Sequence, residues 1–444
     1  MLVVYLLIAI VFIVVSTTKF KLHPFLALIF AALGYGLLSG MEFSDIVASV
    51  NNGFGNIVGY IGIVIIIGCI IGTFLEESGG AYIMARSVIR FSGEKRVPLA
   101  MLILGYIISI PVYADSGFVI LSPLNKALTK RAGLSLACTV IALSLGLTIT
   151  HCLVPPTPGP ISAAAILGAD LGLVILTGLA ASIVVAIVAY FFVTGYVART
   201  YIAPTTDASD EDAVERVKNA PSATKSFIPI IVPLLLIVLK SISDFPTAPF
   251  GDGVFFKTIS FIGEPIIALL IGMLFAFLLP KKLEREMLST TGWVGKSLNS
   301  AAVIIMITAA GGSFGMVLQD SGIADVLGTS LSHAKLGIWL PFIIAAALKT
   351  SQGSSTVAIV TTASLIAPLM GALGFVEPFE KALAVMAVCS GAMVVSHVND
   401  SFFWVVTQMS GLDIRYGYKF HTLGTLVCGV TSMLAVWAMY LLFC

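Results

Sequence analysis

Charged residues are scarce in this chain. Of its 444 residues, 11% are Asp, Glu, Lys or Arg and 58% are hydrophobic, and the mean hydropathy is +1.05. A soluble domain is about 25% charged, because its surface faces water, so an ordinary soluble enzyme is excluded. Disordered chains are polar and charged, which excludes disorder as well. The composition predicts a multi-pass membrane protein in a lipid bilayer.

Several other features are missing. The net charge of +1 gives no reason to expect nucleic acid as a partner. The six cysteines are scattered through apolar stretches, with no C-x-x-C pair and no metal-ligand spacing, so we expect free thiols, no metal and no cofactor. No basic residue precedes the first apolar run, Leu2 to Val15. This order predicts a retained first helix rather than a signal peptide.

Apolar runs long enough to cross a bilayer recur along the chain. A bilayer core of about 30 Å needs roughly 20 helical residues. Segments of mixed polarity at 79–91 and 321–334 are expected to lie in the membrane interface, and the hydrophilic stretch 199–226 is expected to be a cytoplasmic linker. Uninterrupted helices are predicted over 2–18, 24–40, 56–75, 173–198, 227–243, 259–280, 297–318 and 420–443.

Four further apolar segments contain polar breaks. Segments 97–130 and 336–375 are predicted to be re-entrant hairpins. Lys and Arg flank both ends of the first one, and cations collect on the cytoplasmic side, so both of its ends belong on one side of the membrane. Segments 134–170 and 380–412 are predicted to be broken helices, the first interrupted by a run of prolines around Pro156.

The cations favour one orientation in the membrane. We place both termini outside and let each half of the chain cross five times. Of the 24 Lys and Arg, all then fall inside except Lys240, Lys257, Lys335, Lys349 and Lys381. This distribution agrees with the positive-inside rule, so ten crossings are predicted.

The two halves of the sequence resemble one another. Ser144–His151 matches Ser390–His397, and two other matches occur in the same order at a nearly constant offset. Five crossings per half invert the second repeat relative to the first. Inverted repeats with paired broken helices are a transporter architecture whose site lies near the bilayer midplane. The predicted fold is therefore all-α, with two inverted repeats over 1–198 and 227–444.

Polar residues are concentrated at the four breaks. Irregular backbone at membrane depth is tolerated only where it lines a cavity or is buried in protein, and exposed N–H groups at half-helix starts attract anions. The breaks therefore predict a substrate site, although four structural kinks remain the alternative. The candidate substrate-binding residues are Ser116, Gly117, Thr157, Gly159, Lys349, Gln352, Gly353, Ser354, Ser355, Thr356, Asn399 and Ser401.

Ionisable side chains inside the predicted membrane segments cost roughly 2.5–3.5 kcal/mol or more each, and they usually serve a substrate or ion path. Lys349 is the natural counter-charge for a substrate carboxylate, and a structural ion pair with Asp115 or Asp400 is the alternative. Histidine titrates near neutral pH, and a buried carboxyl group can also carry a proton. The candidates for proton coupling are therefore Asp115, His151, His397 and Asp400, unless these groups are only hydrogen-bonded within the protein.

Five strings at or beside the breaks form a specific set. They are Asp115-Ser-Gly-Phe118, Val154-Pro-Pro-Thr-Pro-Gly-Pro160, Leu167–Gly172, Gln352–Ala358 and His397-Val-Asn-Asp-Ser401. This set resembles the gluconate permease family of bacterial proton symporters, within the ion-transporter superfamily. The family pattern continues the last string with a glycine, whereas this chain has a phenylalanine there.

The resemblance implies a secondary transporter of the bacterial inner membrane that imports gluconate or a related sugar acid with a proton. D-Serine is an alternative substrate in the same family, and sodium is an alternative coupling ion in the superfamily. A homodimer and an elevator motion are implied by analogy. An intramembrane hydrolase is disfavoured, since the chain has no G-x-S-x-G and no H-E-x-x-H. A channel or scaffold remains a further alternative.

Overall fold

The computed structural model describes residues 2–84, 87, 96–110, 112–204, 220–243, 253–323, 337–397 and 400–444. This part of the chain is all-helical and contains no strand, as predicted. Five of the described helices are long and apolar enough to cross a membrane, or seven if two bent helix pairs each count as one span. Most of the expected interfacial segments and of the linker lies outside the described residues.

The first half of the chain is helical through most of its described ranges. Its third helix differs from the prediction, because it begins at Phe43 rather than at residue 56 and bends by 45° between Tyr60 and Gly62. The bounds are α1 Leu2–Thr18, α2 Pro24–Ser39, α3 Phe43–Glu77, α5 Val97–Ile108, α6 Ala114–Ala132, α7 Leu136–Leu153, α8 Pro158–Leu167 and α9 Leu171–Gly195.

The second half follows a similar order. Its described elements are α11 Ala223–Ser243, α12 Val254–Ile262, α13 Pro265–Ala276, α14 Trp293–Asp320, α16 Trp339–Gln352, α17 Ser355–Ile366, α18 Pro378–Gly391, α19 Ser401–Ser410, α20 Ile414–Tyr416, the π-helical η5 Gly417–Thr422 and α21 Leu423–Phe443. Short 3₁₀ turns lie at η2 Val197–Arg199, η3 Arg285–Leu288 and η4 Ala367–Leu369.

Two predictions for the second half are corrected by the structure. The single helix expected over 259–280 is the pair α12 and α13, bent by 68°. The bend precedes Pro265, and a proline disfavours helical backbone in the residue before it. The last residues of the expected linker are helical, since α11 already begins at Ala223.

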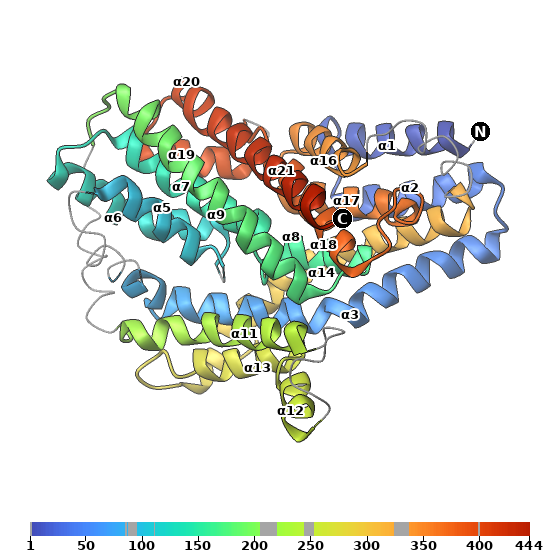
Figure 1. The fold of residues 1–444 in the computed structure, drawn as a ribbon, viewed down its shortest axis with the longest axis horizontal. Helices are drawn as coiled ribbons and strands as arrows, with labels where there is room; N and C mark the ends of the chain where they lie inside the picture. Colours follow the sequence, from blue (N-terminus) through green and yellow to red (C-terminus); the bar gives the residue numbers. More distant parts are fainter. Residues whose placement is uncertain are drawn as a thin grey trace.

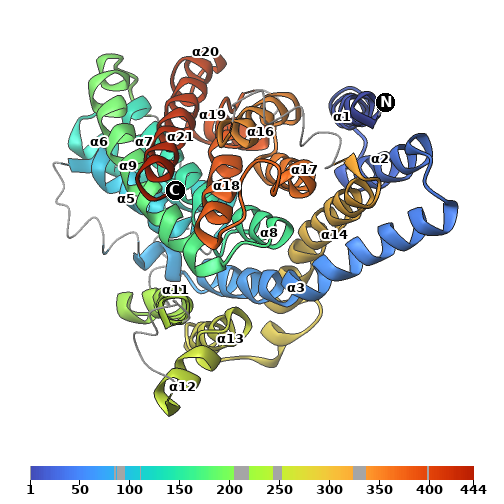
Figure 2. The ribbon, with the colours of Figure 1, turned by 45° about the vertical axis from the view of Figure 1, so that its right-hand side comes forward.

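The helix α3 separates two regions of the molecule. In Figures 1 and 2 it runs along one side of the main body, with α11, α12 and α13 beyond it. The helix α14 packs antiparallel along α3. Gly53 and Gly312 meet in this contact, where a Cβ on either glycine would collide with the backbone of the other. Ser49 Oγ also donates to Asp320 Oδ2 at 2.6 Å. Small and polar residues therefore make the contacts between α14 and the first, polar half of α3.

A helix break lies inside each of the four segments with polar interruptions. Within each half, the first arm of the expected hairpin packs on the first arm of the expected broken helix, as α5 on α7 and α16 on α18. Both contacts use a glycine, because a Cβ at Gly146 would strike the Leu102 carbonyl and one at Gly391 would strike the Phe342 carbonyl. The glycines allow the helix backbones to approach closely.

The second arms pack across the two halves. The helix α6 contacts α19, and α17 contacts α8. All residues of α7 except His151 are buried, so this helix lies in the core of the molecule. The cross-packing brings the four breaks together around the C-terminal end of α7.

The contact at Gly146 yields a test of the packing. We expect Gly146→Ala to lower the apparent melting temperature of the purified protein, because the added methyl group overpacks the α5–α7 contact by about 1–3 kcal/mol. Gly34→Ala is the matched control, since no atom lies within 4 Å of a Cβ at that position. Thermal unfolding in detergent measures both variants, and equal melting temperatures would contradict the packing described here.

Candidate functional site

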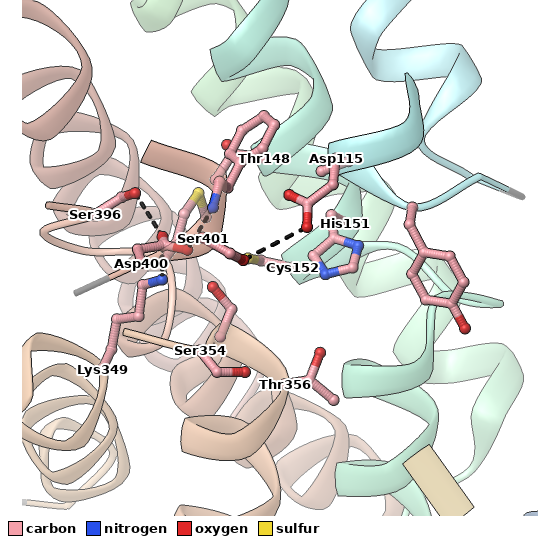
Figure 3. A pocket seen from close by; sticks show the side chains of 15 residues that line it. Asp115, Thr148, His151, Cys152, Lys349, Ser354, Thr356, Ser396, Asp400 and Ser401 are labelled. Atoms are coloured by element: carbon pink, nitrogen blue, oxygen red, sulfur yellow. Dashed lines mark hydrogen bonds and ion pairs between the residues drawn. The ribbon is translucent and has the colours of Figure 1, made fainter. Parts of the chain in front are cut away.

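A cavity of about 190 Å³ lies where the breaks meet. Residues from both halves of the chain line it, and Figure 3 shows their side chains pointing into the same space. The lining residues are Tyr113, Ala114, Asp115, Thr148, His151, Cys152, Lys349, Ser354, Ser355, Thr356, Met393, Ser396, Asp400, Ser401 and Phe402.

Three helices begin at the wall of this cavity. They are α6, α17 and α19, whose first residues are Ala114, Ser355 and Ser401. A fourth, α8, begins at Pro158 beside a smaller cavity that shares Tyr113 and His151 with the first one. The first N–H groups of a helix have no partner within the helix and carry a partial positive charge. The cavity is therefore suited to an anion.

A buried ion pair spans the second half of the site. Lys349 Nζ lies 2.6 Å from Asp400 Oδ2, and both side chains are almost fully buried. Lys349 Nζ also donates to the carbonyl oxygen of Gly353 at the end of its own helix. The pair thus joins the C-terminal end of α16 to the N-terminal end of α19.

Asp400 accepts two more hydrogen bonds. Its Oδ2 accepts from Ser396 Oγ at 2.5 Å, and its Oδ1 caps α19 by accepting from the Phe402 N–H at 3.0 Å. The carboxylate is thus held by an ammonium group, a hydroxyl and a helix N-terminus, which together offset much of the cost of burying its charge.

Asp115 is the second carboxylate at the cavity. It lies half-buried in the first turn of α6, and Ser401 Oγ approaches its Oδ2 at 3.5 Å. Within the described ranges no Lys or Arg forms an ion pair with it. Figure 3 shows Asp115 and His151 at the wall of the same cavity.

His151 occupies the last turn of α7, between the two cavities. Its Nδ1 is buried and has no hydrogen-bond partner among the described residues. Its ring lies 6.4 Å from that of Tyr113, and the Tyr113 hydroxyl lies 3.0 Å from Cys69 Sγ on α3. An unpaired buried nitrogen at a cavity wall is suited to a ligand or a proton.

The candidates from the sequence fall into four groups in the structure. Thr157 lines the smaller cavity, and the Gln352 side chain and Asn399 lie outside the described structure. Ser116, Gly117, Gly159, Gly353 and His397 do not line the main cavity, whereas Asp115, His151, Lys349, Ser354, Ser355, Thr356, Asp400 and Ser401 do.

Several candidate residues that do not line the main cavity have other roles in the structure. Gly117 faces Leu147 and Gly159 faces Ile359, so both permit close packing between helices. Gly353 has a positive φ of 83° and ends α16. His397 Nε2 lies 2.9 Å from the Thr350 carbonyl oxygen.

A family model described as GntP family permease matches residues 1–442. The chain belongs to the GntP permease family. It is 34% identical to a gluconate permease of Pseudomonas aeruginosa, over 97% of this chain and 95% of that protein. It is 31% identical to the D-serine transporter DsdX of Escherichia coli K12, over 96% of each. This GntP family member is therefore a membrane transporter and not an enzyme.

A solved structure supports the fold. The YdaH transporter of Alcanivorax borkumensis matches this GntP permease with a TM-score of 0.67 and 14% identity, covering 95% of this chain and 99% of that one. At that identity the likeness concerns the fold alone.

Sequence reasoning missed several residues of the permease site. Thr148 lies one helical turn before His151 on α7, so its place at the wall follows from the helical period. His421 is completely buried and bonds to Ser396, one of the cavity-lining residues. The sequence could have identified His421 as a candidate, because an ionisable residue inside a membrane helix is by default a candidate for function.

The ion pair yields a double-mutant test. Lys349→Met leaves the Asp400 carboxylate buried without its cation, which typically costs about 3–5 kcal/mol. We expect the single variant to lose thermal stability and Lys349→Met with Asp400→Leu to recover most of it. Melting curves of the two single variants, the double variant and the wild type complete the cycle, and additive losses would contradict the pairing.

Proposed function

We propose that this permease imports a small hydroxy-carboxylate, gluconate or a related sugar acid, together with a proton. The main support is the convergence of three helix N-termini and one ammonium group on one cavity. A carboxylate is stabilised both by the partial positive charge at helix starts and by a nearby cation. The relatives named as gluconate permeases support the choice of substrate.

Lys349 binds the substrate carboxylate in this proposal. An ammonium group has three N–H donors, and two of them serve Gly353 and Asp400. The third is available to an anion in the cavity. Lys349 therefore serves both as a structural partner of Asp400 and as a contact for substrate.

The hydroxyl groups of the substrate meet a wall of hydroxyl side chains. Thr148, Ser354, Ser355, Thr356 and Ser401 line the cavity, and each can donate and accept. The volume of about 190 Å³ is below the roughly 300–1,000 Å³ of pockets for drug-sized ligands. It suits a short polyhydroxy chain.

The charges at the cavity favour proton coupling. Two carboxylates, Asp115 and Asp400, face one ammonium group, Lys349. A substrate anion adds a third negative charge, and two unit charges 4 Å apart repel by about 4 kcal/mol at an effective dielectric constant of about 20. A proton taken up by the site removes this repulsion. The groups proposed to take part are Asp115, His151, His397 and Asp400.

We further propose that the two halves are inverted repeats. The helices α3 and α14 both end in a serine followed by a glycine with positive φ, Gly79 at 76° and Gly322 at 73°. The paired glycine contacts of α5 with α7 and of α16 with α18 also correspond. In this arrangement each repeat crosses five times, both termini lie outside the bacterial inner membrane, and the permease acts as a homodimer.

A D-serine/proton symporter is the second candidate. Asp115 carries no ion pair within the described chain, so it offers a partner for the ammonium group of an amino acid. The relative DsdX is named as a D-serine transporter. Lys349 then takes the carboxylate at the other side of the same cavity.

Uptake into proteoliposomes tests the function. We expect labelled gluconate to accumulate when the outside is more acidic than the inside, and an uncoupler to abolish the accumulation. Sugar acids and D-serine are added as competitors to rank the substrates. Accumulation that follows a sodium gradient at fixed pH would contradict proton coupling, and D-serine as the only competitor would favour the second candidate.

Removing the charge of Asp115 tests the origin of the coupling. Asp115→Asn makes the site less negative, so the anion no longer needs a proton in order to bind. We expect proton-driven accumulation to fall by about tenfold or more while counterflow stays near the wild-type rate, in line with the usual range of coupling energies. Asp45→Asn, on the exposed first turn of α3, is the control. Equal loss of both activities would indicate damage to folding or binding instead.

A further inference from the structure

A chain of hydrogen bonds leads from the cavity into the core. Asp400 Oδ2 accepts from Ser396 Oγ at 2.5 Å, and Ser396 Oγ lies 3.0 Å from His421 Nε2. His421 Nδ1 lies 3.2 Å from Ser144 Oγ on α7. The imidazole is completely buried and belongs to η5, a π-helical turn, an element that is frequent at functional sites.

We propose that His421 holds the coupling proton and that Ser396 passes it from Asp400. This inference rests on the proposed proton symport and names the group that stores the proton. It adds a residue that does not line the cavity.

The hydrogen-bond inventory supports two protonation states of His421. A serine hydroxyl has one proton to donate, and an ionised carboxylate only accepts. Ser396 donates to Asp400, so it accepts from His421 Nε2–H. Ser144 Oγ lies 3.1 Å from the Ile141 carbonyl oxygen, and when it donates there it accepts from Nδ1–H, which suits a doubly protonated ring. When Asp400 is protonated and donates to Ser396, the hydroxyl of Ser396 is free to donate to Nε2, and the ring is then neutral with its proton on Nδ1.

The transfer step balances. A proton from the cavity binds Asp400 Oδ2, which then donates to Ser396 Oγ, while the hydroxyl proton of Ser396 moves to Nε2 of a neutral His421 that carries its proton on Nδ1. Asp400 is again a carboxylate, Ser396 again a hydroxyl, and His421 an imidazolium. During the step the attraction between Asp400 and Lys349 weakens, which frees Lys349 for the substrate carboxylate.

The surroundings make Asp400 the counter-charge of this imidazolium. Asp400 and the Lys349 bound to it are the charged groups on the cavity side of the ring. α7 presents the uncharged Ser144, and α19 presents Phe402 and Phe403, whose ring centroids lie 5.6 and 6.1 Å from that of His421.

The remaining neighbouring elements add no charge at the ring. α21 supplies Thr425, which accepts from the Ser396 N–H. The charged side chains of α20 and η5, Arg415 and Lys419, are exposed, and so is the capping Asp413. His151, also on α7, faces the cavity.

Transport by His421→Gln tests the proposal. Glutamine can bond to Ser396 but cannot store a proton. In proteoliposomes with labelled gluconate, we expect proton-driven accumulation to fall by about tenfold or more and counterflow to change less than about threefold. His23→Gln, at the exposed cap of α2, is the control and should behave as wild type. Unchanged accumulation in His421→Gln, or equal loss of accumulation and counterflow, would overturn the proposal.

A second variant keeps the test decisive if His421→Gln does not fold. Ser144→Ala removes the acceptor of Nδ1–H. The protonated ring requires this acceptor, whereas a neutral ring can do without it by carrying its proton on Nε2, so accumulation should need a more acidic outside and its pH profile should shift to lower pH. An unshifted profile would overturn the proposal. Wild-type protein that shows no gradient-dependent accumulation would instead contradict the proposed function itself.

Discussion

The buried ion pair between Lys349 and Asp400 is the contact on which the rest of the site depends. It joins the end of α16 to the start of α19, and Asp400 in turn orients Ser396 and caps α19. Breaking such a pair leaves an uncompensated charge in an apolar interior. The pair therefore fixes the geometry of two breaks at once, and it sets the positive and negative groups that a substrate meets.

The first half of the chain supplies a contrasting arrangement. Asp115 lies in the first turn of α6, and within the described residues it has a serine contact and no cation. The two carboxylates at the cavity thus differ in their partners. The cavity therefore holds two carboxylates and one ammonium group. In the proposed mechanism, this excess of negative charge links the binding of an anion to the uptake of a proton.

Much of the fold could be predicted from the sequence. Apolar runs mark the membrane helices, and proline, glycine and polar residues mark the breaks in them. The prediction was wrong for α3, because the first half of this helix is polar. That half contacts α14 through Ser49 and through the close approach of Gly53 and Gly312. No apolar run marks such a helix. The bend before α13 was missed because Gly263 and Glu264 interrupt an otherwise apolar stretch too briefly.

The site was predicted as a set of motifs, but the structure decides which members face the cavity. Asp115 reaches the wall while its neighbours Ser116 and Gly117 do not, since adjacent helical residues point in different directions. His421 lies on η5, 25 residues after Ser396, and only the packing of η5 brings the two side chains together. Sequence position alone carries no signal for that contact.

In the proposed symport the substrate anion and a proton occupy the site together. The most direct test is the number of protons that purified protein takes up from weakly buffered solution when gluconate or D-serine binds. We expect uptake of about one proton per bound substrate, following the charge balance of the cavity. Saturable binding with no proton uptake between pH 6 and 8, roughly the range in which histidine titrates, would contradict it.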